Sequence, residues 1–146
     1  MFVKNTDPEV GKQNDLESRK MGKILIVDDS EVVRMQISRI LSGAGYEVLA
    51  ARDGPEGIKF AADHPDISII LSDYNMPDMS GLTMLEAIKK TSEHKNTFCG
   101  VLTTESSPSL KERGKAIGVS FWIVKPVEDK KLIKVTETIM ARLEAS

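Results

Sequence analysis

Three aspartates stand out in this chain because each follows a short apolar run. Asp28 and Asp29 come directly after residues 24–27, and Asp73 comes directly after residues 67–72. Runs of this length and composition, closed by acids, predict buried strands whose ends emerge at a site. Like charges at neighbouring strand ends repel one another by ~1 kcal/mol per pair at 4 Å in water, and by more where solvent is excluded. This cluster of carboxylates therefore indicates a bound cation.

The elements that must position these aspartates alternate regularly from Gly22 onward. Apolar runs with strand character are separated by segments whose apolar residues recur at helical spacing. Residues that cap or break helices, such as serine, glycine and proline, stand at the boundaries. The predicted strands are residues 24–27, 46–50, 67–72, 97–102 and 119–124. The predicted helices begin at about residues 30, 53, 81, 107 and 128, and they end near residues 43–45, 62, 90, 114–118 and 143.

This alternation predicts an α/β fold, an open doubly wound parallel sheet with helices on both faces and right-handed crossovers. In such sheets a ligand binds at the carboxyl ends of the strands, where the strand order reverses. The aspartates, Thr103 and Lys125 all fall at that edge of the predicted sheet. Residues far apart in the chain thus converge on one small volume.

Composition limits the possible functions. A chain of 146 residues, 40% hydrophobic and 29% charged, fits one globular domain with its own core. We expect a flexible arm over residues 1–20, which lack any hydrophobic period, and the domain over 21–146. A net charge of -2 gives no basic surface for nucleic acid.

Targeting signals and cysteine usage favour a cytoplasmic protein. No apolar run approaches the ~18 residues of a membrane span, and the first residues do not form a signal peptide. The single Cys99 excludes an intrachain disulfide and is expected to be a small buried strand residue. His64 and His94 stand apart, so we expect them to be structural residues at the surface.

Four segments together resemble the receiver domain of two-component response regulators, over essentially all of residues 21–146. They are residues 24–30, 72–81, 101–105 and 122–126. The chain is most similar to stand-alone receivers of the chemotaxis CheY type. The resemblance implies the flavodoxin-like, CheY-like fold, with five helices and five strands in the order 2-1-3-4-5. This strand order is the one known for that family.

The resemblance also implies roles for the acids. Asp73 would be the phosphoacceptor, and Mg²⁺ would be held by Asp28, Asp29, Asp73 and the backbone carbonyl of Asn75. Hard oxygen ligands suit Mg²⁺, and a carboxylate beside a metal can attack a phosphoryl group in line. Taken alone, Asp73 is also explained as a helix cap, and the Asp28–Asp29 pair as acids that favour a helix N-terminus.

Further positions match the family's switch residues. Lys125 would contact the phosphoryl oxygens, Thr103 would move to bind them, and Trp122 would be the switch aromatic. A cis bond between Lys125 and Pro126 is also implied. The alternatives are a solvated lysine before a proline, a strand threonine and a simply packed aromatic.

Two departures and two matches bear on kinetics. Thr104 stands where many receivers have alanine or another small residue, and Trp122 is larger than the usual tyrosine or phenylalanine. Narrower access to Asp73 and a restricted aromatic rotation are therefore expected. Asn75 and Glu105 match positions that tune water attack in chemotaxis receivers, and we expect brisk self-dephosphorylation.

The expected function is a phosphorylation-dependent binding module and not an enzyme, apart from self-phosphorylation by small donors and self-dephosphorylation. A sensor histidine kinase would supply the phosphoryl group. A downstream protein such as the flagellar motor switch would dock on the fourth helix, fifth strand and fifth helix, and a phosphatase is a further possible partner. The protein is expected to be a monomer.

Other functions remain open beside this one. A non-chemotaxis output or a phosphate sink fits the same residues. A phosphatase of the haloacid dehalogenase class requires its nucleophile in an Asp-Xaa-Asp motif after the first strand. The segment Asp28-Asp29-Ser30 lacks this motif. A degenerate scaffold receiver would not be expected to keep the complete set of site residues.

Overall fold

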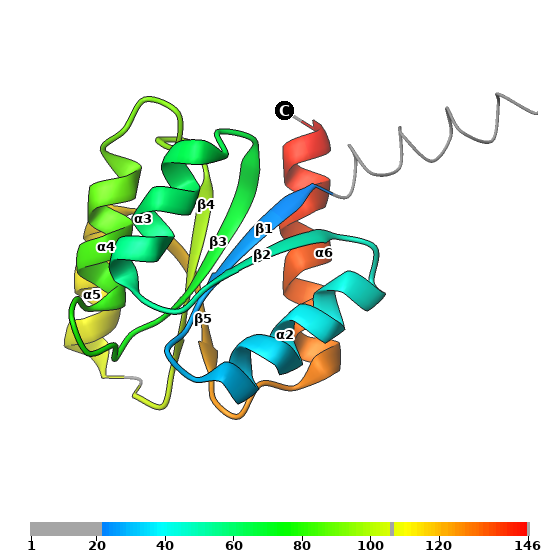
Figure 1. Cartoon of the computed structure of the whole chain (residues 1–146), viewed down its shortest axis with the longest axis horizontal. Helices are drawn as coiled ribbons and strands as arrows, with labels where there is room; N and C mark the ends of the chain where they lie inside the picture. Colours follow the sequence, from blue (N-terminus) through cyan, green and yellow to red (C-terminus); the bar gives the residue numbers. More distant parts are fainter. Residues whose placement is uncertain (1–21, 106, 146) are drawn as a thin grey trace, which may run out of the picture.

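A computed structural model describes residues 22–105 and 107–145. This part of the chain folds into a five-stranded parallel sheet with helices on both faces (Figure 1). The strands are β1 (Lys23–Val27), β2 (Glu47–Ala51), β3 (Ile67–Asp73), β4 (Phe98–Thr103) and β5 (Val119–Val124). The helices are α2 (Glu31–Gly43), α3 (Gly54–Asp63), α4 (Gly81–Lys89), α5 (Pro108–Ile117) and α6 (Asp129–Ala145). The predicted flexible arm, residues 1–20, lies outside the described residues.

The order of the strands determines where a ligand site can form. The order is β2-β1-β3-β4-β5, and every neighbouring pair is parallel, which confirms the predicted fold. From β1, the next strand in the chain, β2, lies on one side, and all later strands, beginning with β3, lie on the other side. The direction in which strands are added therefore reverses between β1 and β3. The register pairs Val27 with Ser72 and therefore sets the carboxyl ends of these two strands side by side.

Two apolar cores lie on the two faces of the sheet. Figure 1 shows α3, α4 and α5 on one face and α2 with α6 on the other. Because successive strand residues point to opposite faces, Leu25 and Val27 enter one core while Ile24 and Ile26 enter the other. Burial on both faces explains why β1 is apolar without a break from Ile24 to Val27.

Capping side chains set most helix boundaries. Ser30, Asp53, Ser80 and Ser107 each accept a hydrogen bond from the backbone N–H three residues further on. Predicted and observed helix ends differ by no more than a few residues, as is usual for frayed helix termini. The second strand begins at Glu47, one residue later than predicted, because the Tyr46 N–H donates to the Leu41 carbonyl at 3.1 Å and belongs to the turn.

The surface position predicted for His94 is wrong. Its side chain is 1% exposed. Nε2 lies 2.6 Å from the carbonyl oxygen of Ala61, and Nδ1 lies 2.9 Å from Oγ1 of Thr97. His94 therefore ties the end of α3 to the segment that enters β4. The other histidine, His64, is half-buried.

Cys99 is buried in β4 with a free thiol, which confirms its expected environment. Burial raises the pKa of this thiol to about 12, so it is protonated at neutral pH. Among the helices of the described residues, none combines the length and the apolar character that crossing a membrane requires.

Candidate functional site

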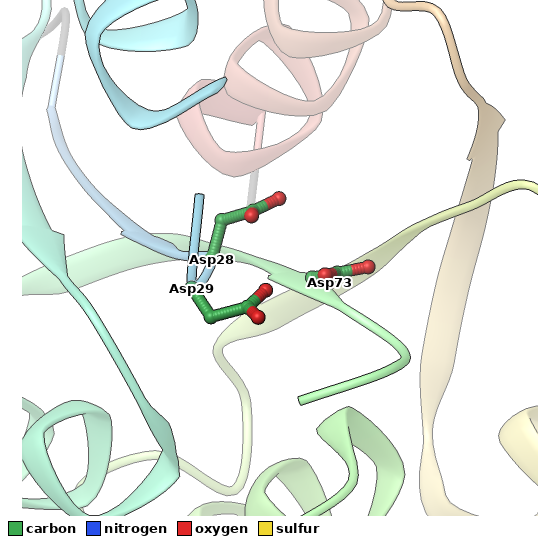
Figure 2. A group of neighbouring side chains, drawn as sticks. All are labelled: Asp28, Asp29 and Asp73. Atoms are coloured by element: carbon green, nitrogen blue, oxygen red, sulfur yellow. The ribbon is translucent and has the colours of Figure 1, made fainter. Parts of the chain in front are cut away.

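The structure brings Asp28, Asp29 and Asp73 together at the reversal point of the sheet. Figure 2 shows the first two leaving the end of β1 and the third leaving the end of β3. One carboxylate oxygen from each lies within 4.8 Å of the other two. Asp28 is fully buried and Asp73 is 7% exposed, whereas Asp29 is exposed. The site therefore has a buried floor and one solvent-facing acid.

Asp28 is held by contacts to its backbone and to both carboxylate oxygens. Oδ1 accepts from the N–H of Ser30 at 2.9 Å, and Oδ2 accepts from Nζ of Lys125 at 3.0 Å. The Asp28 N–H donates to the carbonyl of Ala51 at 3.1 Å. The Asp28 carbonyl oxygen accepts from Nη1 of Arg34 at 2.7 Å. These contacts fix the orientation of Asp28.

Asp73 sits in an unfavourable place for a negative charge. Burial, and then the charge of Asp28, raise its pKa to about 6, although the ammonium of Lys125 at 3.2 Å from Oδ1 partly offsets this. The Asp73 carbonyl accepts from Oγ of buried Ser72 at 2.9 Å. Gly81 packs so closely on that carbonyl that a side chain there would collide with it. The backbone around Asp73 is therefore tightly constrained.

Lys125, which directly follows β5, forms ion pairs with both buried acids, Asp28 and Asp73. Its side chain is 20% exposed, and the peptide bond to Pro126 is cis, the form that the resemblance implies. Burial lowers the pKa of Lys125, but its hydrogen bonds and charge pairing with Asp28 and Asp73 outweigh this and raise the pKa above its usual value. Lys125 therefore stays protonated at neutral pH.

Thr103 reaches the site edge but not Asp73. Its side chain is 2% exposed, and Oγ1 accepts from the N–H of Glu105 at 2.9 Å. Among the described residues, no hydrogen bond joins this hydroxyl to Asp73. Asn75, Thr104 and Glu105 are exposed on the loops that follow β3 and β4. The side chains of Asn75 and Glu105 are therefore open to solvent.

Trp122 lies in β5 at the edge of the sheet. It is partly buried against the core beneath α5, and Gly114 of that helix leaves the room that the indole fills. This packing supports the simple structural interpretation of the residue. It also couples β5 to α5, as the switch interpretation requires.

Sequence reasoning missed three contributors to the site. Ser72 and Gly81 were recognised as parts of a family motif, but not as residues that hold the Asp73 carbonyl. A small residue facing a strand end is a signal that could have pointed to Gly81. Arg34 carried no signal, because a lysine or arginine in a first helical turn is usually solvated.

The donor set fits a hard divalent cation such as Mg²⁺. The three acids offer only oxygen ligands, two of them from buried side chains. With every group ionised, three carboxylates and one ammonium leave an excess of negative charge in a place with little solvent. A divalent cation would relieve that excess.

The fold defines a class, the doubly wound α/β proteins, in which ligands bind at the point where the strand order reverses, and the acidic cluster of this chain lies at that point. The family model of the response regulator receiver domain matches residues 24–137. The chain therefore belongs to the response regulator receiver domain family, and it is CheY-like within it.

Relatives with the same fold are numerous. The chain is 35% identical over 114 residues to the chemotaxis protein CheY of Treponema pallidum, covering 77% of this chain and 78% of that protein. The structure of the chemotaxis protein CheY4 of Vibrio cholerae has a TM-score of 0.79 and 41% identity, covering 82% of this chain and 98% of that one. A CheX–CheY–BeF3–Mg²⁺ complex from Borrelia burgdorferi has a TM-score of 0.76 and 28% identity, covering 81% and 88%.

Proposed function

We propose that this receiver domain accepts a phosphoryl group on Asp73 and uses it to switch the binding of a partner protein. The observation that carries the proposal is the placement of Asp73: it is buried beside two further acids and within 3.2 Å of the Lys125 ammonium. Mg²⁺ would be held by Asp28, Asp29, Asp73 and the backbone carbonyl of Asn75.

The proposed phosphoryl transfer depends on the carboxylate of Asp73 and the ammonium of Lys125, which lie side by side. A carboxylate oxygen of Asp73 forms a bond to phosphorus while the phosphorus–nitrogen bond of a donor phosphohistidine breaks. The electron pair of that bond stays on the imidazole nitrogen, which takes up a proton. Lys125 stabilises the negative charge on the equatorial oxygens. Mg²⁺, when bound, would supply further charge stabilisation for the same oxygens.

The donor in this proposal is a sensor histidine kinase, and the chain acts as a signalling protein. Membership of the receiver family supports this assignment. Self-phosphorylation by small donors and self-dephosphorylation are the only catalytic steps proposed. A cytoplasmic location is part of the proposal, and the free, buried Cys99 is compatible with it.

The switch follows from where the new charge appears. A phosphoryl group on Asp73 competes with Asp28 for Lys125. It also offers an acceptor to the O–H of Thr103, whose oxygen accepts from the Glu105 N–H in the present structure. The loop after β4 then moves toward Asp73, and Trp122 responds through its packing on α5. The face formed by α5, β5 and α6 changes shape. A partner that prefers the new shape by ~3 kcal/mol discriminates by about a hundredfold.

Chemotaxis is the proposed output, and the relatives and solved structures that are named CheY support it. A flagellar motor switch protein is the proposed partner, and a phosphatase is a further proposed partner. A CheY relative has been crystallised in complex with a second protein, CheX, which supports partner binding. The protein is proposed to act as a monomer. Another signalling output or a phosphate sink would use the same phosphorylated state.

Labelling with a small phosphodonor and Mg²⁺ tests the proposed chemistry. The wild-type chain and Asp78→Asn, which changes an exposed acid in the following loop, should both become phosphorylated, whereas Asp73→Asn should not. Absence of labelling in the wild type would favour a fixed scaffold. Turnover of an external phosphate ester without stable labelling would favour a phosphatase of the haloacid dehalogenase class.

Partner capture tests the output. Proteins retained from lysate by the chain with beryllofluoride and Mg²⁺ should include motor switch proteins, and those retained by the metal-free chain should not. Retention of only unrelated proteins would reject the chemotaxis output and leave the phosphorylation chemistry standing.

A further inference from the structure

The peptide between Asp28 and Asp29 is held by a contact to which the phosphorylation chemistry gives no role. Arg34, in the first turn of α2, donates from Nη1 to the Asp28 carbonyl oxygen at 2.7 Å. Hydrogen bonds from an ionised donor are shorter and stronger than those between neutral groups. Because the peptide unit is planar, a fixed carbonyl at Asp28 also fixes the amide that begins Asp29.

The two acids joined by this peptide depend on it to different extents. Both carboxylate oxygens of Asp28 have donors of their own, from Ser30 and Lys125. The Asp29 carboxylate is exposed, and the described ranges 22–105 and 107–145 contain no hydrogen bond or ion pair to it. The position of this acid is therefore set by its backbone, which Arg34 anchors.

We propose that Arg34 is a positioning residue for the cation site. It orients Asp29 through the shared peptide and touches neither the cation nor the phosphoryl group. This role rests on the Mg²⁺ site of the proposed function. It differs from that of Lys125, which contacts the acids directly.

A second effect of Arg34 has the opposite sign. Its positive charge repels a cation, so removal of the charge alone would tighten Mg²⁺ binding. Arg34 is half-buried, and solvent ions screen a charge in that position. Loss of a group that orients a metal ligand typically costs about 10- to 100-fold in metal affinity. Positioning should therefore outweigh repulsion.

Calorimetric titration of Mg²⁺ into the full chain at neutral pH separates the two effects. Arg34→Met should raise the dissociation constant by about tenfold. Arg34→Lys keeps the charge and one donor group, and should fall between Arg34→Met and the wild type. Arg39→Met removes the same charge from an exposed position of the same helix, so its affinity should match the wild type.

The amide resonance of Asp29 gives a readout that does not depend on metal. Its nitrogen belongs to the peptide that Arg34 anchors, so it should shift in Arg34→Met and stay in place in Arg39→Met. Unchanged or tighter Mg²⁺ binding by Arg34→Met, or an unmoved Asp29 amide, would overturn the assignment. A folded wild type that binds no Mg²⁺ would instead reject the proposed function, and this role of Arg34 with it.

Discussion

Both edges of the sheet carry ionic groups, but they are balanced in opposite ways. At the amino ends of the strands, Lys23 of β1 pairs with Asp66 at 2.9 Å and with Glu47 at 3.8 Å. Both acids there are largely exposed. At the carboxyl ends, Lys125 faces buried Asp28 and Asp73, with Asp29 close by.

The pKa shifts of the acids record this difference. A hydrogen bond from Lys23 holds the pKa of Asp66 below its usual value, so that pair favours the folded state when ionised. Burial and the charge of Asp28 instead raise the pKa of Asp73 to about 6. The ion pairs at the amino edge stabilise the fold. At the carboxyl edge, three carboxylates repel one another and only one ammonium offsets them, so this edge can be stabilised further by a bound cation.

The largest effect on stability should come from the amino edge. His94→Ala removes two buried hydrogen bonds and leaves a cavity, and it should lower the free energy of unfolding by about 3 kcal/mol. Denaturant unfolding measures this change, and Mg²⁺ affinity of the folded variant should not change. His64→Ala, at a half-buried position of the same edge, should have a much smaller effect. Equal losses in the two variants would show that the buried contacts of His94 contribute little.

Removal of a charge at the carboxyl edge should have the opposite sign. Asp73→Asn keeps the shape of the side chain but removes a buried charge, so at neutral pH it should stabilise the fold by about 2 kcal/mol. Asp66→Asn at the amino edge should instead cause a small loss of stability, because it removes the partner of Lys23.

The effect of pH separates this charge from other consequences of the substitution. The folded protein binds the Asp73 proton more tightly than the unfolded chain, because the folded pKa of about 6 lies above the ordinary 3.8. Stability from this group is present below 3.8 and is lost as the pH rises through about 6. The gain from Asp73→Asn should therefore be small near pH 4 and complete above pH 7. A gain of the same size at both pH values would show that the charge is not its cause.

The structural features that the sequence predicted correctly are those encoded in local residue patterns. Strand and helix positions follow from apolar periodicity and capping residues, and the placement of Asp28 and Asp73 at the same edge follows from the geometry of any parallel sheet. The strand order came from the resemblance to receiver domains. Local pattern alone does not distinguish one order from another.

The burial of His94 was missed because it depends on a contact between distant segments. His94 lies among Glu93, Lys95 and Asn96, a polar stretch typical of a surface loop. Its imidazole is nevertheless buried, in contact with the backbone carbonyl of a residue that lies 33 residues earlier in the chain. The packing of α3 against the segment before β4, which brings Ala61 to His94, is a tertiary feature. Arg34 was missed for a different reason: its partner lies only six residues earlier in the chain, but that partner is a backbone oxygen, which leaves no trace in the side-chain pattern.

Matched lysine substitutions at the two edges should separate them by metal affinity. Lys125 donates to oxygens of Asp28 and Asp73 that a cation would also use. Lys125→Met removes this competitor, and it should lower the Mg²⁺ dissociation constant by about tenfold. Lys23→Met should leave the constant unchanged, although it breaks an ion pair of its own. Weaker Mg²⁺ binding by Lys125→Met would mean that Lys125 holds the acids in place more than it competes for them.

The smallest expected effect concerns the lifetime of the phosphorylated state. Asn75 and Glu105 are exposed polar residues on the loops that follow β3 and β4. From the resemblance to chemotaxis receivers, we expect each to hydrogen-bond a water that attacks the phosphorus. Replacement of either by alanine should slow loss of the phosphoryl group by about fivefold, the equivalent of one hydrogen bond of ~1 kcal/mol. Glu47→Ala, an exposed acid at the amino edge, should leave the decay rate unchanged. Decay measured after removal of the phosphodonor compares the three variants, and an unchanged rate for both Asn75→Ala and Glu105→Ala would show that access to the carboxyl edge is set by its backbone alone.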